Sequence, residues 1–486
     1  MNKHNCIALD MGASSVRAIL GQYDGNRLEL HELSRAINEP CVIRDELFWN
    51  VLGLYRECQR AIEAYDAREF GKLFSFAIDG WGSDYGLLDR DGYLISNPCH
   101  YRHRRTGNIM EKTRTVMDER RLFDLTGNAS IRYNTVYQLL SMKVGQSAQL
   151  ENAHTLLMIP DLLAYFFTGE RYVEYTNATT TQLTDFDRSG WNRVVMDTFN
   201  LPIDIMPPII QPGYIYKNAC EDAALIATAS HDTACAVAAI PKQKEDTAFI
   251  SSGTWSLVGT ETQTPVINDK VYKYGYSNEG GVGGKNLLLR NTAGMWIIQQ
   301  CMNAWQDQGI NIDYIQLLNQ AEEEPAFKTF IDVDDDDFAD PGDMPEKIRK
   351  HCKRKGHDVP NSVSAMARCI LESMAFKYRV CIENLEDILE QPLSALHIVG
   401  GGSQNDVLNK YTANALNKLV ISGPVEATAA GNVAVQLMAF GEITGLNEIR
   451  DLVDRSFTKQ VYEPTDTFIW NEAFGSYCIA IGRQTN

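Results

Sequence analysis

The chain alternates short apolar runs, several of which end in a polar turn with glycine, with longer stretches that are apolar on one face. The short runs predict buried strands and the longer stretches predict amphipathic helices. The predicted strands are Cys6–Asp10, Val16–Tyr23, Leu28–Ser34, Phe74–Asp79, Ala248–Ser251, Trp255–Thr260, Leu287–Asn291, Leu396–Val399 and Leu419–Ser422. The predicted helices include Phe48–Asp66, Arg120–Gly127, Asn134–Lys143, Thr155–Gly169, Thr233–Ile240, Thr292–Trp305, Asn361–Leu389, Val407–Leu416 and Glu426–Ala439.

Acidic turns recur where predicted strands end. Asp10 and Asp79 each close an apolar run just before a glycine, and Asp232 stands in the polar turn that opens the helix Thr233–Ile240. In open α/β sheets such strand ends gather at one edge, where ligands bind. The recurrence therefore predicts a cleft in which negative charge collects.

Three glycine-bearing turns have the composition of phosphate or nucleotide loops. They are Gly12–Ser15, which Arg17 follows, Ser252–Thr254 between two predicted strands, and Gly400–Gly402 before a predicted helix. Glycine lets backbone N–H groups approach a phosphate closely, and a helix N-terminus favours an anion. The first turn alone could equally be a plain hairpin, so the interpretation as phosphate loops rests on the three turns together.

Composition limits the classes of function. The 486 residues are 44% hydrophobic and 22% charged, which is ordinary for a globular enzyme of two or three domains. A formal charge of −18 argues against nucleic acid or an anionic membrane as partner, but not against ATP held locally. No apolar run approaches the roughly 20 residues of a membrane span, and the first strand begins too early for a signal peptide.

The eleven cysteines are dispersed and form no C-x-x-C pair, a pattern typical of reduced thiols in the cytoplasm. Cys352 and Cys369 are the pair most open to chance oxidation. The turn Pro241–Asp246 predicts a boundary between domains 1–243 and 244–486, with a ligand cleft between them. The small-residue helix Glu426–Ala439, which contains Gly431, is expected to pack tightly at the hinge.

Three other features have two readings each. The basic segment Asn97–Arg105 is either a solvated surface or a loop that faces a ligand, and its His100 and His103 lack the pattern of a metal pair. The run Asp334–Asp337 predicts a solvated loop or, less in keeping with its pattern, a calcium site, since it lacks the glycine and closing glutamate of a calcium loop. Trp81, between two glycines, is either a core residue or a face for stacking on a sugar.

Four stretches together resemble the FGGY family of carbohydrate kinases. They are Ile7–Ser15, Ala77–Gly82, Ser251–Trp255 and Ile398–Gly402, in the family's order and spread over nearly the whole chain. The resemblance implies an α/β fold of two ribonuclease H-like domains, of the actin and hexokinase type, with a ligand cleft between them. It also implies ATP as co-substrate and Mg²⁺.

The resemblance assigns roles by position. The expected ATP-binding residues are Ala13, Ser14, Ser15, Val16, Arg17, Thr254, Gln299 and Gly401. The expected sugar-binding residues are Gly82, His231, Asp232, Thr233 and Asn291, with Trp81 as a stacking candidate. Asp232 is the expected catalytic base. His231 is expected to orient the sugar, with the role of base as its alternative, and Asp10 and Asp79 are candidates for Mg²⁺ through water. Val16 departs from a pattern that often has glycine there.

Four further segments most resemble the family members that phosphorylate the 1-hydroxyl of L-rhamnulose in L-rhamnose breakdown. They are Glu174–Gln182, Ser230–Ala234, Ser277–Gly281 and Gly423–Ala427. The alternatives are another ketose, L-fuculose first, and a non-catalytic regulator that uses the ATP clamp as a switch. A cytoplasmic monomer or homodimer is expected, with sugar and ATP as its only partners.

Overall fold

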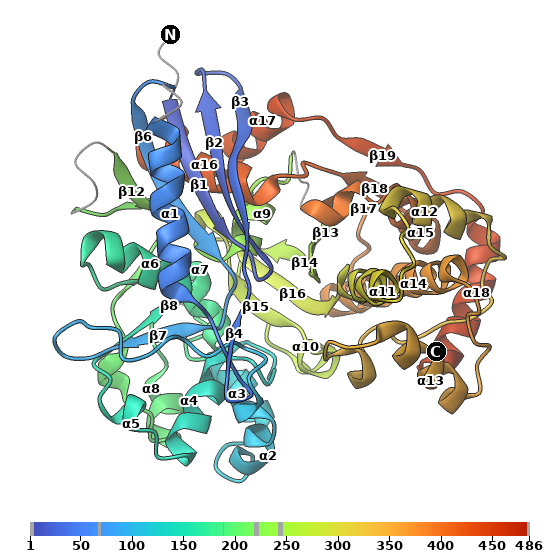
Figure 1. Ribbon diagram of the computed structural model, residues 1–486, viewed down its shortest axis with the longest axis horizontal. Coiled ribbons are helices and arrows are strands. Elements are labelled where there is room, and N and C mark those ends of the chain that lie inside the picture. Colours follow the sequence, from blue (N-terminus) through green and yellow to red (C-terminus); the bar gives the residue numbers. More distant parts are fainter. Residues whose placement is uncertain (1–3, 67–69, 188, 218–222, 242–245, 484–486) are drawn as a thin grey trace. The chain divides into compact units, whose positions relative to one another are not determined.

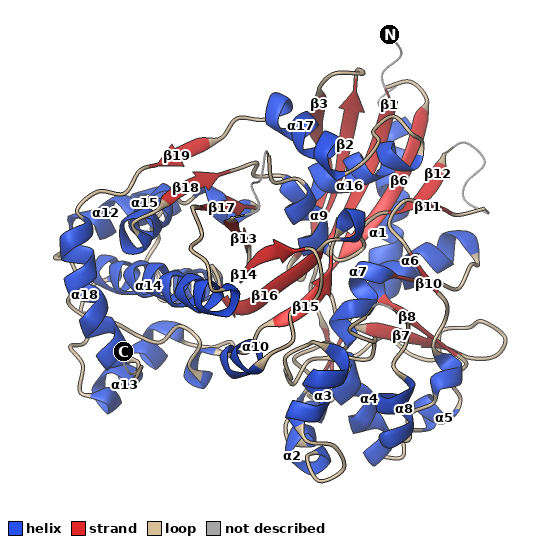
Figure 2. Cartoon of the chain, turned by 180° about the vertical axis from the view of Figure 1, so that it is seen from behind, coloured by secondary structure: helices blue, strands red, loops and turns tan. Residues whose placement is uncertain are grey.

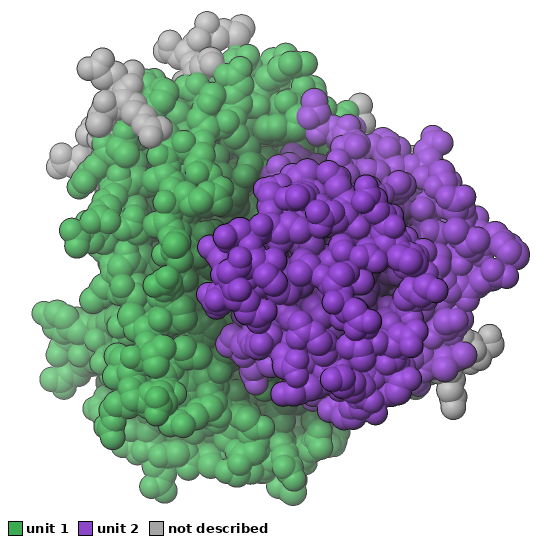
Figure 3. All heavy atoms as spheres, turned by 45° about the vertical axis from the view of Figure 1, so that its right-hand side comes forward, with its two compact units in different colours: residues 1–243, 261–289, 426–457 green, residues 244–260, 290–425, 458–486 purple. Residues whose placement is uncertain are grey.

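The computed structural model describes residues 4–66, 70–187, 189–217, 223–241 and 246–483 (Figure 1). The chain divides into two compact units, coloured separately in Figure 3. Unit 1 comprises Met1–Gln243, Glu261–Leu289 and Glu426–Phe457, and unit 2 comprises Lys244–Thr260, Arg290–Val425 and Thr458–Asn486. The segments Glu261–Leu289 and Glu426–Phe457 return to unit 1, and the domain limits 1–243 and 244–486 stay a prediction. Residues 242–245 of the turn Pro241–Asp246 lie outside the described residues.

A six-stranded sheet with the order β11-β12-β6-β1-β2-β3 is the centre of unit 1. The strands are β1 (His4–Met11), β2 (Ser15–Tyr23), β3 (Leu28–Ile37), β6 (Leu73–Gly80), β11 (Tyr214–Ile215) and β12 (Ala224–Ala227). The first three form an antiparallel meander, whereas β6 runs parallel to both β1 and β12. The parallel ends of β1 and β6 therefore meet at one edge of the sheet.

Helices cover both faces of this sheet. α1 (Val51–Asp66) and α6 (Ile159–Thr168) pack on one face, and α9 (Asp232–Ala238) and α16 (Ala427–Ala439) pack on the other. Figures 1 and 2 are opposite views, with α1 in front of the sheet in the first and α16 in front in the second. The expected helix Phe48–Asp66 begins three residues late, since Phe48 ends the short strand β5 (Glu46–Phe48).

α16 and α9 approach each other closely at Gly431. A Cβ atom built on Gly431 would lie 2.0 Å from the carbonyl oxygen of Cys235, so only glycine fits between the two helices. The expectation of tight packing by the small-residue helix is confirmed, and its partner is α9 of the same unit. The role of this helix as a hinge stays a prediction.

Short elements complete unit 1. They are β4 (Cys41–Ile43), β7 (Tyr85–Leu88), β8 (Thr155–Met158), β9 (Val173–Glu174), β10 (Ile209–Ile210), β15 (Ser277–Gly280), α2 (Ile109–Thr113), α3 (Glu119–Thr126), α4 (Thr135–Val144), α5 (Ala148–Glu151), α7 (Tyr175–Ala178), α8 (Arg193–Thr198), α10 (Asp269–Tyr274) and α17 (Leu446–Ser456). The predicted helix Thr155–Gly169 is wrong in its first four residues, which pair with β7 as β8. The helix begins at Ile159, with Pro160 in its first turn, where proline is favoured.

Unit 2 has its own sheet, in which β14, β13, β17, β18 and β19 lie side by side in that order. The strands are β13 (Thr247–Ser252), β14 (Trp255–Thr262), β17 (Ala395–Val399), β18 (Leu419–Ser422) and β19 (Gln460–Tyr462). The helices are α11 (Trp296–Asp307), α12 (Tyr314–Glu323), α13 (Met344–Lys355), α14 (Val363–Leu389), α15 (Asp406–Leu416) and α18 (Thr467–Ala480). The helix expected from Thr292 begins only at Trp296, because Thr292 and Ala293 continue β16 (Asn286–Ala293).

No helix among the described residues combines the length and the apolar character that crossing a membrane needs. The cysteines that the structure describes carry free thiols, including Cys352 and Cys369. Burial raises the pKa of Cys352 to about 11, which keeps this thiol protonated and weakly nucleophilic at neutral pH.

Candidate functional site

Two aspartates stand side by side where β1 and β6 end in unit 1. The parallel register pairs Asp10 with Asp79, and both are buried. The carboxylate of Asp10 contacts the guanidinium of Arg17, which also donates through Nη1 to Oε2 of Glu426 at 2.7 Å. Burial would lower the pKa of Arg17, but the charges of Asp10 and Glu426 raise it above its ordinary value. The side chain expected to contact ATP is thus already held by two carboxylates.

Asp79 is buried with one of its two carboxyl oxygens lacking a partner among the described residues. Its Oδ2 accepts a hydrogen bond from Nδ2 of Asn432 on α16 at 2.6 Å, while its buried Oδ1 has no hydrogen-bond partner among the described residues. Burial first, and then the charge of Asp10, raise the pKa of Asp79 well above its ordinary value. Nothing in the sequence near Asp79 indicated Asn432, which lies more than 350 positions along the chain.

Asp79 fits the Mg²⁺ site expected of it and Asp10, although the carboxylate of Asp10 is already paired with Arg17. Carboxylate oxygens are preferred ligands of Mg²⁺, which usually keeps several of its own waters. The unpartnered Oδ1 and the raised pKa show that the ionised form of Asp79 is poorly stabilised by this chain alone, and a divalent cation would stabilise it.

Asp232 is the first residue of α9, and His231 caps that helix. Nε2 of His231 lies 3.5 Å from Oδ1 of Asp232, whose side chain is 32% exposed. Burial and the charge of Asp10 raise the pKa of Asp232, whereas His231 lowers it. Thr233 is buried and donates its backbone N–H to Oδ1 of Asp232 at 2.6 Å. An accessible carboxylate with a raised pKa suits a general base.

A buried glutamate fixes the turn before α9. Oε2 of Glu174 accepts hydrogen bonds from the backbone N–H of Ser230 at 2.8 Å and from its hydroxyl at 3.0 Å. Oγ1 of Thr176 accepts the backbone N–H of His231 at 3.1 Å. These contacts set where His231 and Asp232 enter the site. The sequence singled out the segment Glu174–Gln182 but not this role for its first residue.

Trp81 belongs to a buried aromatic cluster. Its indole nitrogen donates to Oδ2 of Asp84 at 3.0 Å, and its ring centroid lies 4.2 Å from that of Trp49. Burial raises the pKa of Asp84 to about 6, although the indole of Trp49 lowers it. Of the two readings of Trp81, the core role is therefore the one the structure supports. Gly82 is half-buried beside this cluster.

The first glycine turn is compact. The N–H of Gly12 donates to the carbonyl of Ser15 at 2.9 Å, and Nδ2 of Asn38 donates to the carbonyl of Gly12, also at 2.9 Å. Ser14 is exposed, and Ala13 and Ser15 are half-buried, so this turn is accessible to a ligand. Val16 lies in β2 with its side chain in the core. Any contact that Val16 makes with ATP must therefore come from its backbone.

Unit 2 brings its two glycine turns together. A Cβ atom on Gly402 would lie 2.0 Å from the hydroxyl oxygen of Ser252, so the two turns are in direct contact. The N–H of Met295 donates to the carbonyl of Gly253 at 3.0 Å, which brings the start of α11 to the same place. The turns are accessible, since Gly401 is exposed and Thr254 half-buried, and Gln299 is exposed on the first turn of α11.

Asn291 is held near these turns by an unforeseen anchor. Oδ1 of Asp334 accepts hydrogen bonds from the Thr292 hydroxyl at 2.7 Å and from the Ala293 N–H at 2.9 Å, and Oδ2 pairs with Lys377 at 2.8 Å. The prediction of a solvated acidic loop is therefore wrong for Asp334. Oδ1 of Asn291 is buried and has no hydrogen-bond partner in the described parts of the chain, so it is available to accept a hydrogen bond from a ligand.

The basic segment is mostly folded inward. His100 stacks on Trp49 with ring centroids 4.2 Å apart, and burial lowers its pKa to about 3. His103 is also buried, and Arg105 donates to Oε1 of Gln138 at 2.6 Å. A fully solvated surface is thus wrong for these three residues, while Arg104 is exposed.

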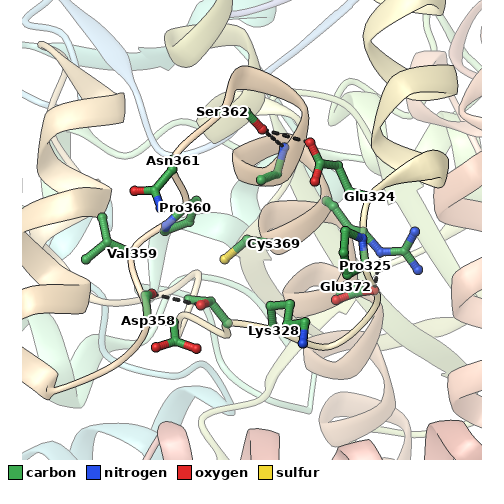
Figure 4. A pocket seen from close by; sticks show the side chains of 13 residues that line it. Glu324, Pro325, Lys328, Asp358, Val359, Pro360, Asn361, Ser362, Cys369 and Glu372 are labelled. Atoms are coloured by element: carbon green, nitrogen blue, oxygen red, sulfur yellow. Dashed lines mark hydrogen bonds and ion pairs between the residues drawn. The ribbon is translucent and has the colours of Figure 1, made fainter.

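Two further features of unit 2 contain none of the expected site residues. Asp335, Asp337 and His351 offer ligand atoms within 4.8 Å of one another, but the guanidinium of Arg354 already contacts Asp337. A cavity of about 490 Å³ lies between the start of α14 and the segment after α12, with Cys369 and Glu372 at its base (Figure 4).

The sequence matches two family models, one after the other along the chain. Residues 5–239 match the N-terminal domain of the FGGY family of carbohydrate kinases, and residues 248–440 match its C-terminal domain. A curated protein from Bacteroides thetaiotaomicron, named rhamnulokinase, is 36% identical over 97% of this chain and 98% of its own length. Rhamnulokinases from Oceanobacillus iheyensis and Pectobacterium atrosepticum are each 35% identical, over 94% and 95% of this chain and 97% and 93% of their own lengths.

Solved structures share the fold. A ligand-bound xylulose kinase from Lactobacillus acidophilus superposes with a TM-score of 0.79 at 16% identity, covering 98% of this chain and 97% of its own. A glycerol kinase from Plasmodium falciparum with ADP gives 0.78 at 14% identity and covers 99% of both chains. The expected two-domain α/β fold of the sugar kinase, actin and hexokinase type is confirmed.

Proposed function

Since the chain belongs to the FGGY family of carbohydrate kinases, we propose that it transfers the γ-phosphate of ATP to the 1-hydroxyl of L-rhamnulose. The products are L-rhamnulose 1-phosphate and ADP, in L-rhamnose breakdown. The observation that carries the choice of sugar is the match to three rhamnulokinases at 35–36% identity over nearly their whole length.

Asp232 acts as the general base in this proposal. It accepts the proton of the 1-hydroxyl while the sugar oxygen bonds to the γ-phosphorus and the bond to the ADP oxygen breaks. Its raised pKa makes the ionised carboxylate a stronger base than an ordinary aspartate. His231, Thr233, Gly82 and Asn291 hold the sugar, and the unpartnered Oδ1 of Asn291 supports its part in this.

The glycine turns bind ATP. Ala13–Arg17 in unit 1 and Thr254, Gln299 and Gly401 in unit 2 are the proposed contacts, and the accessibility of Thr254, Gln299 and Gly401 supports the assignment. Backbone N–H groups in such turns stabilise phosphate charge. Asp10 and Asp79 would hold Mg²⁺ through water, and the ion would supply positive charge that offsets the charge of the phosphates. Because the reaction consumes ATP, we place the protein in the cytoplasm, as a monomer or homodimer.

A panel of ketoses tests the choice of sugar. ADP release is followed with L-rhamnulose, L-fuculose and D-xylulose at saturating Mg²⁺ and ATP, and kcat/KM is compared. The proposal expects L-rhamnulose to give the highest value and the product to carry phosphate on C1. A higher kcat/KM for L-fuculose would overturn the choice of sugar, and ATP binding without turnover of any ketose would indicate a regulator instead.

A further inference from the structure

A second carboxylate faces the imidazole of His231 from the side opposite Asp232. Oε2 of Glu279, on β15, lies 3.3 Å from Nδ1 of His231. Both atoms are buried, and neither has a hydrogen-bond partner among the groups that the structure describes, so the two face each other as a close ion pair. Nε2 of the same ring lies 3.5 Å from Oδ1 of Asp232. The three side chains therefore form a row of carboxylate, imidazole and carboxylate within unit 1.

The backbone on both sides of Glu279 is clamped. The N–H of Gly280 donates to Oγ1 of Thr179 at 2.8 Å, and the N–H of Asn278 donates to the carbonyl of Gly127 at 3.0 Å. The glutamate side chain is only 11% exposed, so it has little freedom to turn away from the ring. A carboxylate held this firmly beside an imidazole nitrogen selects the ring form that carries a proton there.

We propose that Glu279 is a positioning residue for the reaction: it keeps the proton on Nδ1 of His231 and turns Nε2 towards Asp232 and the sugar. Glu279 does not touch the reacting atoms, and its effect passes through His231. The inference rests on the proposed function of His231 and Asp232 as sugar-binding residue and base.

The charges around His231 agree with this arrangement. Glu279 on β15 and Asp232 on α9 contact the ring, the charge of Glu174 on β9 acts on it, and no cation that the structure describes pairs with it. Burial would lower the pKa of His231, but its contact with Glu279 raises it above the ordinary value. Because a protonated His231 also lowers the pKa of Asp232, Glu279 helps to keep the base ionised.

The test is a double-mutant cycle on sugar kinetics. Glu279→Gln keeps the shape of the side chain but removes its charge, and should lower kcat/KM for the sugar about tenfold to a hundredfold, with KM for ATP unchanged. In a His231→Ala background the same change should have almost no effect, because the group it acts through is gone. Equal losses in both backgrounds would overturn the proposal. Glu261→Gln is the matched control, since Glu261 is equally buried but pairs with Arg450.

A spectroscopic readout separates this inference from the identity of the sugar. ¹⁵N spectra of histidine-labelled protein, with the His231 signal assigned from His231→Ala, report which ring nitrogen carries the proton. In the wild type Nδ1 should stay protonated throughout, and the ring should lose its positive charge, through Nε2, at a higher pH than in Glu279→Gln. An identical His231 titration in both proteins would refute the role of Glu279, whichever ketose is the substrate.

Discussion

Adding one methyl group at Gly431 should impair catalysis from a position outside the site. In Gly431→Ala the new Cβ atom starts 2.0 Å from the carbonyl oxygen of Cys235, whereas real Cβ atoms essentially never approach closer than 3.0 Å. α16 and α9 must therefore separate by about 1 Å. α9 begins with Asp232, one turn before Cys235, so the carboxylate moves with its helix.

The size of the effect follows from this displacement. A misplacement of about 1 Å in a catalytic group can cost about a hundredfold in rate, so kcat should fall by about that factor. Overpacking lowers the free energy of unfolding by about 1–3 kcal/mol, and replacing a helical glycine by alanine raises it by about 1 kcal/mol. The free energy of unfolding should therefore fall by only about 0–2 kcal/mol, and the variant should remain folded.

Steady-state kinetics and denaturant unfolding measure the two quantities on the same preparations. Gly475→Ala in α18 is the matched control, because nothing lies within 4 Å of its new Cβ atom. That variant should keep its kcat and gain about 0.5–1 kcal/mol in stability. A folded Gly431→Ala protein with wild-type kcat would refute the claim that this contact sets the position of Asp232.

Three other outcomes are expected. Thr254→Val keeps the shape of the side chain but removes the hydroxyl, so KM for ATP should rise while sugar binding is unchanged; a rise in sugar KM alone would place Thr254 elsewhere. Asp334→Asn should lower the free energy of unfolding by about 1–3 kcal/mol at pH 7, because Lys377 loses one of its two ion pairs and retains only the one with Asp332. Lys377 and Arg290 lower the pKa of Asp334 despite its burial, so this difference should persist above the ordinary aspartate pKa of about 3.9 and vanish as the pH falls through the lowered value; unfolding curves that differ equally at pH 2 and 7 would contradict it. Sugar with a nonhydrolysable ATP analogue should close the two units, and an unchanged radius of gyration in X-ray scattering would argue against closure.

Local patterns predicted the strand ends of the candidate site. Asp10, Asp79 and Asp232 each follow a recognisable apolar run, so their places in the fold could be inferred without contacts. The residues that pair with this site could not be inferred in the same way. Asn432 and Glu426 lie on or just before α16, more than 190 residues beyond Asp232, and no local pattern marks them as partners of the site.

Two errors have physical causes that a single sequence hides. Thr155–Met158 is a short apolar run, which fits a buried strand as well as a helix, and only its pairing with β7 decides. Asp334 belongs to a run of four aspartates, a pattern typical of a solvated loop. The ammonium of Lys377, from the middle of α14, makes the burial of Asp334 favourable.

The most direct test of the account is the rate of phosphoryl transfer in Asp232→Asn. The amide keeps the size of the carboxylate but cannot accept the proton, so kcat should fall roughly 10²–10⁴-fold. Calorimetric affinities for L-rhamnulose and for ATP should stay within a few-fold of the wild type, which shows that the site is intact. Near-normal kcat in this variant, with binding retained, would contradict the assignment of Asp232 as the base.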